Sequence, residues 1–290
     1  MKKRNSPIFL LIVPVLFCVL LSHRELRAQQ QIEPKYISIS EGLSSPTVNS
    51  VLQDSYGLIW VGTPNGVQKY DGYRFETFKN IPGKPNRLQY NRVWGLLEDA
   101  EHNIWVGANE GIARYDRLKN QFVNYSLSNL VVPGGALTFR FFQDSQKRLW
   151  AGTQNLEVLK YEPTSDEWKL AKYEIPNVDQ SSHNGVSLGM TEDSKGDVWI
   201  GSVSHGLMRL AKNENAFKPI PMEQLGGINF VTTGNSITYL RAGAANTLWI
   251  TTRNGVYRYN TVTATMNMLR EYRDAQVEIW NNWNCILPDP

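Results

Sequence analysis

Cysteine is scarce in this sequence of 290 residues, which contains only Cys18 and Cys285. Cys18 lies in an apolar run, Ile8 to Leu21, that directly follows a basic N-terminus. This arrangement is typical of an export signal, and the run is shorter than the roughly 20 residues that span a bilayer. Removal of the signal leaves one cysteine, which excludes an internal disulfide and a thiolate metal site.

The sequence also lacks a strong excess of charge. We expect residues 1–28 to form a signal peptide cleaved after Ala28, and residues 29–290 to form the mature domain. An uncleaved anchor is the alternative, because Leu26 is larger than the residue usually preferred there. Cleavage removes five basic residues and one acidic residue, so the formal net charge falls from +3 to −1. A chain so close to neutral is not expected to bind nucleic acid.

Histidine and catalytic motifs are equally sparse. Three of the four histidines follow the signal, namely His102, His183 and His205, and no two have the spacing of metal ligands. No nucleophile elbow, zinc-protease helix or phosphate-binding glycine loop occurs, and helical periodicity extends over no useful length. The sequence therefore predicts neither a metal nor a cofactor.

What the sequence does contain is a repeat centred on tryptophan. The strings LIWVGT, NIWVGA, RLWAGT, DVWIGS and TLWITT place Trp60, Trp105, Trp150, Trp199 and Trp249 at spacings of 45, 45, 49 and 50 residues. Such a period with strand-like content is typical of propeller blades. We expect an all-β propeller of four-stranded antiparallel blades, with five full repeats and the start of a sixth at Trp283–Pro290, hence an incomplete ring. Lys35–Ser40 is predicted to be an outer strand for a last blade.

Each repeat also carries residues suited to turns and packing. An aspartate six residues before the tryptophan, at Asp54, Asp99, Asp144 and Asp193, is expected to accept backbone N–H bonds across a turn. Gly57, Gly196 and Asn246 suit the positive φ of that turn, whereas His102 and Lys147 suit it less well. Because the tryptophans recur in every repeat, they are interpreted as packing wedges between blades rather than sugar platforms. Basic–aromatic–polar triplets such as Lys69-Tyr70-Asp71 are expected to pair charges between strands.

The run GLSSPTVNSVLQDSYGLIWVGTPNGVQKYDGYRFETF, Gly42 to Phe78, resembles the two-component regulator propeller family, and WVGANEGIARYD in the second repeat is similar to it. Later repeats depart from the pattern, for example at Leu156 and Thr251. The resemblance implies an N-terminal fragment of a hybrid sensor histidine kinase, and within it a periplasmic input module that recognises an oligosaccharide. The sequence contains no phosphoacceptor helix, nucleotide-binding glycine box or receiver domain, so we expect no catalytic activity from this chain.

Binding residues are expected where the repeats differ, in connections that open on one end of the sheets. Aromatic, amide and guanidinium groups there suit polyhydroxylated or acidic sugars. Ordinary loop polarity is the competing explanation for each of them. The strongest candidates are Arg92, Trp94 and Trp283. Weaker candidates are Tyr90, Asn91, His183 and Trp280, and Arg87 lies in the same connection as Arg92.

The expected partner is an oligosaccharide or another small periplasmic ligand. The resemblance also implies a homodimer formed through the parent receptor, and a membrane reached through that receptor or an uncleaved signal. A free-standing secreted propeller lectin or protein-interaction scaffold is the main alternative. A propeller-type lyase is a further one, which would need His183 or His205 to find a partner acid.

Overall fold

The computed structural model describes residues 36–84, 87–109, 111–127, 130, 138–153, 158–174, 187–202, 206–228, 237–252 and 255–271. All strands belong to one compact unit, which begins at Ser38. Within the described ranges, no helix is long and apolar enough to cross a membrane. The predicted signal peptide and the predicted sixth repeat, Trp283–Pro290, lie outside these ranges.

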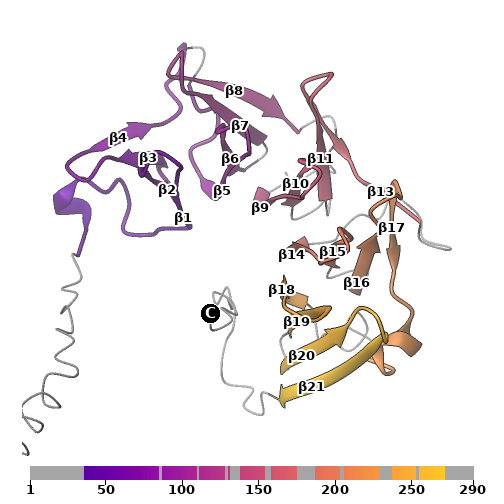
Figure 1. Ribbon diagram of the computed structural model, residues 1–290. Coiled ribbons are helices and arrows are strands. Elements are labelled where there is room, and N and C mark those ends of the chain that lie inside the picture. The colour runs from indigo at the N-terminus through magenta and orange to yellow at the C-terminus, as the bar shows by residue number, and fades with distance from the viewer. Residues whose placement is uncertain are drawn as a thin grey trace, which may run out of the picture. The chain divides into compact units, whose positions relative to one another are not determined.

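Five antiparallel sheets follow one another in chain order, each built from four consecutive strands (Figure 1). The first contains β1 (Ser50–Gln53), β2 (Ile59–Thr63), β3 (Gly66–Tyr70) and β4 (Phe75–Phe78). The second contains β5 (Val93–Glu98), β6 (Ile104–Ala108), β7 (Gly111–Asp116) and β8 (Gln121–Ser126). The third contains β9 (Thr138–Gln143), β10 (Leu149–Thr153), β11 (Val158–Glu162) and β12 (Glu167–Leu170). The fourth contains β14 (Ser187–Glu192), β15 (Val198–Ser202), β16 (Gly206–Leu210) and β17 (Ala216–Pro219). The fifth contains β18 (Ile237–Ala242), β19 (Thr247–Thr252), β20 (Gly255–Asn260) and β21 (Thr265–Glu271).

The fourth sheet has one strand more than the repeat predicts. β13 (Lys172–Tyr173) comes from the chain that leaves the third sheet, and it pairs in parallel with β17. The Tyr173 ring stacks on Phe217 of β17, with 5.8 Å between the ring centroids. The chain thus reinforces the outer edge of the next sheet before entering it.

The predicted strand Lys35–Ser40 is wrong over its described part. Tyr36 to Ser38 form no strand, and Ile39–Glu41 form the short 3-10 helix η1. The Ser38 hydroxyl accepts from the Ser40 N–H, while the Glu41 carboxylate accepts from the Ser38 N–H. This capping box satisfies locally the backbone groups that a strand would have to pair with a neighbour.

One contact recurs in the first four sheets. The second carboxylate oxygen of each repeated aspartate accepts a hydrogen bond from the indole Nε1 of the tryptophan six residues later. The pairs are Asp54–Trp60 (2.7 Å), Asp99–Trp105 (2.6 Å), Asp144–Trp150 (3.0 Å) and Asp193–Trp199 (2.9 Å). The first oxygen accepts backbone N–H groups of the turn, as Asp54 does from Tyr56 and Leu58. The predicted turn-capping role is confirmed, and the same carboxylate also orients the ring.

The turn between the first two strands has the same geometry in every sheet. The third residue after the aspartate position has a positive φ in all five sheets, at Gly57 (82°), His102 (63°), Lys147 (62°), Gly196 (84°) and Asn246 (58°). His102 and Lys147 therefore adopt the left-handed conformation, at a cost of about 1 kcal/mol each. The carboxylate bonds that close the turn offset this cost.

The fifth sheet has Gly243 in place of the aspartate. A Cβ atom added to Gly243 would lie 2.6 Å from Nε1 of Trp249, so the indole occupies the room that a side chain would need. Trp249 is only half-buried, whereas the other four repeat tryptophans are buried. Loss of the carboxylate thus coincides with a less buried ring.

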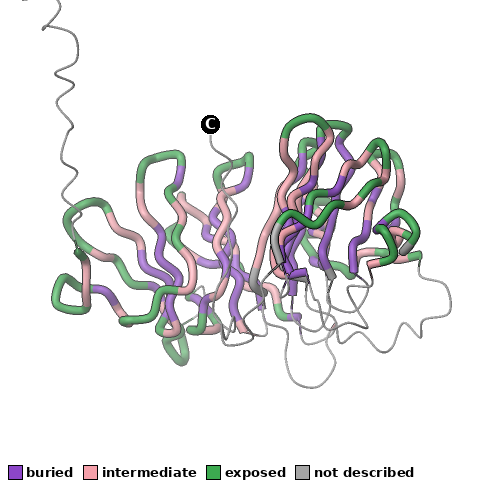
Figure 2. Tube along the Cα trace, turned by 90° about the horizontal axis from the view of Figure 1, so that it is seen from below, coloured by how far each residue is buried: buried purple, intermediate pink, exposed green. Residues whose placement is uncertain are grey.

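Packing between sheets uses the same tryptophans. The tyrosine of a triplet packs edge-on against the tryptophan of the preceding sheet, as Tyr115 does on Trp60 at 5.0 Å between centroids and Tyr161 on Trp105 at 4.8 Å. Gly62 permits the close approach, because a Cβ atom there would lie 2.7 Å from Val93 in the next sheet. Buried segments accordingly lie along the strands, and exposed ones lie mainly in the turns (Figure 2).

The triplet cations lie over the rings and bridge strands. Lys69 pairs with Glu76 of β4 at 2.6 Å, and its ammonium group lies 5.9 Å from the Trp60 ring centroid. Arg114 lies 5.6 Å from the Trp105 ring in the same way. The predicted charge pairing between strands is confirmed for Lys69, and a cation–π contact accompanies it.

Polar contacts also join the first two sheets. Arg117 donates to Asp54 at 3.0 Å and to Glu98 at 3.1 Å, while the Ser55 hydroxyl donates to Glu98 at 2.7 Å. Burial alone would raise the pKa of Asp54, but the hydrogen bonds from Trp60, Leu58 and Arg117 outweigh it and lower that pKa. The Asp54 carboxylate is therefore ionised at neutral pH.

We predict that Asp99→Ala lowers the free energy of unfolding by about 2–4 kcal/mol, because it leaves a buried indole N–H and turn N–H groups unsatisfied. Trp105→Phe should cost about 1–3 kcal/mol, and the two changes should couple by at least about 1 kcal/mol in a double-mutant cycle. Urea unfolding followed by circular dichroism measures these values. Asp116→Ala, which removes the cap of an exposed turn and a surface ion pair with Lys119, is the control with a far smaller effect. Strict additivity of the two substitutions would contradict the pairing.

Candidate functional site

Two kinds of loop meet at one end of the sheets. Because the strands alternate in direction, the turn after each second strand and the connection leaving each fourth strand lie at the same end. In the first sheet, Gly66 N donates to the carbonyl of Asn91 at 2.7 Å. In the second, Asn109 N donates to the carbonyl of Arg92 at 3.2 Å. The expectation that both loops open at one end is confirmed here, around the connection from β4 to β5.

Two predicted binding residues in this connection hold the loop. The Tyr90 ring lies against Gly111, where an added Cβ atom would be 2.5 Å from Tyr90 Cε2. The Asn91 side-chain carbonyl accepts from the backbone N–H of Asn80 at 2.7 Å. Tyr90 and Asn91 therefore position the loop, and the prediction that they bind a ligand remains untested.

Arg92 and Trp94 lie together at the start of β5. The Arg92 guanidinium is exposed, and its central carbon lies 5.9 Å from the centroid of the half-buried Trp94 ring. The Trp94 indole N–H donates to the side-chain carbonyl of Asn109 at 2.7 Å, which fixes the orientation of the ring. The pair presents an oriented aromatic group beside hydrogen-bond donors.

The remaining predicted binding residues, Trp283, His183 and Trp280, lie outside the described residues. The repeat tryptophans other than Trp249 are at most 3% exposed, so their faces are not accessible to a sugar: Trp60, Trp105, Trp150 and Trp199. Their interpretation as packing wedges agrees with this burial.

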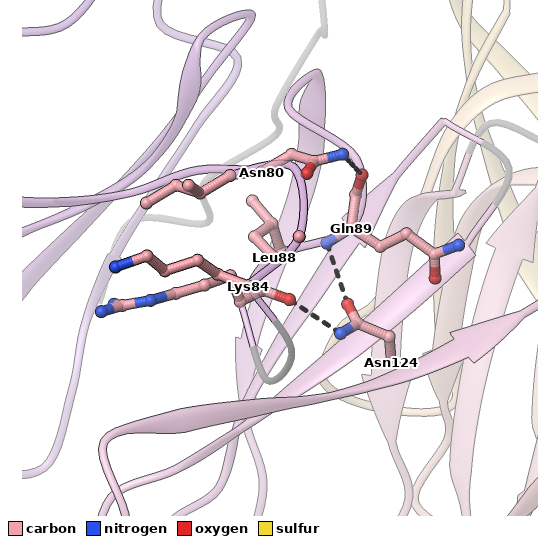
Figure 3. A pocket seen from close by; sticks show the side chains of 8 residues that line it. Asn80, Lys84, Leu88, Gln89 and Asn124 are labelled. Carbon is pink, nitrogen blue, oxygen red and sulfur yellow. Dashed lines mark hydrogen bonds between the residues drawn. The ribbon is translucent and has the colours of Figure 1, made fainter.

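A pocket of about 420 Å³ lies in the same connection (Figure 3). Its polar lining residues are Asn80, Lys84, Arg87, Gln89 and Asn124. Arg87 was expected in this connection from the sequence, but the pocket was not predicted. The sequence feature that could have revealed the pocket is the lack of negative charge, since no acidic residue occurs between Glu76 and Glu98.

Hydrogen bonds from two sides fix the backbone of this pocket. Asn124 of β8 accepts from Gln89 N at 3.0 Å and donates to the Arg87 carbonyl at 2.8 Å. Asn80 donates to the Gln89 carbonyl at 2.7 Å, and Leu88 between them is 1% exposed in the core. The bonds drawn in Figure 3 therefore tie the connection to the second sheet through Asn124 and join its two halves through Asn80.

His102 is the histidine in the described part of the chain. It follows the C-terminal end of β5, whereas Arg92 precedes the N-terminal end. Its Nδ1 is 2.9 Å from the Ser55 hydroxyl and 3.4 Å from a Glu98 oxygen. This places a histidine beside an acid, but far along the strand from Arg92 and the pocket. Across the described residues, no three His, Cys, Asp or Glu side chains are grouped so that they could hold a metal ion.

The first two repeats match the sequence model of a known family. The sequence model described as two component regulator propeller matches residues 42–65 and 87–110, which contain the Asp54–Trp60 and Asp99–Trp105 pairs. The first two repeats are therefore two-component regulator propeller repeats, as the sequence resemblance predicted. A stretch of 42 residues is 43% identical to Histidine kinase P4 of Formosa agariphila, and it covers 14% of this chain and 3% of that protein.

Solved structures confirm the propeller fold. The extracellular domain of the putative hybrid two component system BT4673 from B. thetaiotaomicron aligns with a TM-score of 0.50 and 21% identity, covering 84% of this chain and 35% of that one. Virginiamycin B lyase from Staphylococcus aureus, solved with quinupristin as a catalytically inactive variant, aligns with a TM-score of 0.55 and 17% identity, covering 78% and 71%. This chain thus spans about a third of the two-component extracellular domain.

We predict that Asn124→Ala loosens the connection without unfolding the protein. The variant should lose about 1 kcal/mol of stability, because two hydrogen bonds to the loop backbone are removed. Hydrogen exchange should become at least about tenfold faster at the Gln89 amide, while the β6 amides stay protected. Asn65→Ala, which removes an exposed bond to Ser44, is the matched control. Unchanged exchange at Gln89 would show that Asn124 does not hold the loop.

Proposed function

We propose that this chain is the ligand-binding input module of an exported sensor histidine kinase, and that it binds an oligosaccharide without catalysing a reaction. The observation that carries the proposal is the pair of two-component regulator propeller repeats at residues 42–65 and 87–110. The local identity to a histidine kinase supports the same assignment.

The location is proposed from two independent features. The basic N-terminus and the apolar run from Ile8 to Leu21 favour export. The structural neighbour from a putative hybrid two component system is itself an extracellular domain. An extracytoplasmic module in a sensor has to detect a ligand outside the cytoplasm, which fits the proposed role and a periplasmic location.

Sugar binding is proposed from the chemistry of Arg92 and Trp94. An indole face suits the apolar C–H face of a pyranose, and a guanidinium donates several directed hydrogen bonds to hydroxyl or carboxylate oxygens. Asn109 already orients the indole, so little conformational freedom is lost when a ligand binds. The non-repeating position of this pair also favours ligand binding over a framework role.

The proposed lack of catalysis rests on the contacts that already occupy the described carboxylates. Asp54, Asp99, Asp144 and Asp193 are buried and bound to turn N–H groups and indoles, so they are not placed to protonate a bound sugar. His102 and Glu98 lie at the opposite end of β5 from Arg92. A lyase is nevertheless one of the structural neighbours, and turnover therefore belongs in the test.

We predict that purified protein binds tetrasaccharides of hexoses or hexuronic acids, and that it returns them chemically unchanged. Arg92→Ala and Trp94→Ala should each weaken binding at least about tenfold, or about 1.4 kcal/mol, by calorimetry. Tyr73→Ala is the matched control, because Tyr73 is a 95% exposed aromatic residue in a turn of the first sheet. Binding that neither variant alters would place the site elsewhere, and a mass change in the sugar would contradict the absence of catalysis.

We also predict that the gene continues beyond the codon for Pro290 into a membrane-spanning helix and a histidine kinase. The chain spans about a third of a related extracellular domain, so further propeller repeats should come first. Sequencing of the genomic DNA tests this directly. A stop codon at that point, with a soluble product that binds sugar, would favour the free-standing lectin or scaffold instead.

A further inference from the structure

The connection between the first two sheets has an unusual charge distribution. Residues 77–97 contain four cations and no carboxylate, namely Lys79, Lys84, Arg87 and Arg92. None of these four forms an ion pair with a described residue, although cations elsewhere in the fold pair with acids. Cations that lie close together on one loop repel one another, so an anionic ligand would stabilise such a loop.

Two of these cations, Lys84 and Arg87, line the pocket, and the lining residues Asn80 and Asn124 hold the loop backbone. Both amide atoms of Asn124 and the amide nitrogen of Asn80 are engaged in holding the loop backbone. Lys84, Arg87 and the Gln89 side chain form no hydrogen bond with a described side chain. Figure 3 shows the Lys84 side chain extending away from the hydrogen bonds of Asn124.

Hydrogen bonds hold the described backbone on both sides of these cations. Leu88 anchors the loop in the core between Arg87 and Gln89, and Asn124 bonds to the backbone of both flanking residues. The Lys84 N–H donates to the Ile81 carbonyl at 3.0 Å. Because these backbone positions are already bonded, most of the freedom that a ligand would remove is that of the long side chains of Lys84 and Arg87.

We propose that this pocket binds the anionic group of an acidic oligosaccharide, with Lys84 and Arg87 as the two cations that hold it. The inference rests on the proposed function, because it names the class of sugar that the module recognises. A planar guanidinium matches a carboxylate or sulfate ester with two parallel hydrogen bonds, and the ammonium adds a compact charge. Gln89 supplies a neutral donor for a hydroxyl, and Ile81 supplies an apolar surface for the ring.

Three matched tetrasaccharides test the proposal by calorimetry on the full chain: one of galacturonic acid, one of sulfated galactose and one of unmodified galactose. We expect at least one acidic tetrasaccharide to bind about tenfold or more tightly than the neutral one in about 50 mM salt. This preference should shrink at about 500 mM salt, because exposed charges are screened. The two acidic probes distinguish a carboxylate from a sulfate ester.

The double variant Lys84→Gln with Arg87→Gln should remove the preference for acidic sugar and leave neutral binding within about threefold of the original protein. Lys195→Gln is the control for loss of a cation elsewhere on the surface, because Lys195 is an exposed lysine in the turn before β15 and not in this connection. Its preference should be unchanged. Circular dichroism confirms that each variant remains folded.

Other results would overturn the proposal in distinguishable ways. Equal binding of acidic and neutral sugars would exclude an anion site but leave oligosaccharide recognition intact. A preference that survives the double variant and disappears in Arg92→Ala would move the anion contact to the Arg92–Trp94 pair. If no tetrasaccharide binds to the original protein, the anion site and the proposed function both fail.

Discussion

The hydrogen bond between a buried carboxylate and an indole N–H is the contact on which the rest of this structure depends. In each of the first four sheets it ties the turn between the first two strands to the ring that fills the space between sheets. A buried carboxylate without such partners would be strongly unfavourable, so turn and ring have to form together. Once the indole is fixed, the tyrosine of the next sheet and the cation of the neighbouring strand have a defined surface to pack on. The fifth sheet shows the converse, because Gly243 lacks the carboxylate and Trp249 is less buried.

This framework uses the residues that repeat and leaves the connection from β4 to β5 free to differ. The repeated aspartates and the tryptophans of the first four sheets are buried, so they are not available to a ligand. The connection is held instead by single, non-repeating contacts, chiefly those of Asn124 and Asn80. Hydrogen bonds hold its backbone at Arg87, Gln89 and Asn91, and Leu88 packs in the core, whereas exposed side chains such as Arg92 are not constrained by the repeat. These exposed side chains can therefore vary with little effect on the packing between sheets.

The sequence predicted the framework well, because its determinants recur at a fixed spacing. Four-stranded sheets, turn-capping aspartates and wedge tryptophans all follow from the period. The indole–carboxylate bond was missed, since nothing in a linear sequence shows that residues six apart meet across a turn. Lys35–Ser40 was predicted wrongly because alternating apolar residues suggest a strand, while Ser38 and Glu41 close a local capping box. The two-residue strand β13 is too short to show any period. The pocket depends on Asn124, which is 35 residues from Gln89 and has no local pattern to reveal it.

One connection carries two pairs of side chains with different chemistry, namely Arg92 with Trp94 and Lys84 with Arg87. The first combines an aromatic face with a guanidinium, and the second concentrates charge over a pocket. Both are attached to a backbone that is bonded to Gly66 in the first sheet and to Asn124 in the second. A ligand can alter a conformational equilibrium only if it binds the two states with different affinity. Because this connection is bonded to both sheets, any change in the spacing of those sheets changes the geometry of its side chains. If the proposed ligand binds at this connection, its affinity is therefore physically linked to the sheet-to-sheet packing that the Asp–Trp pairs set.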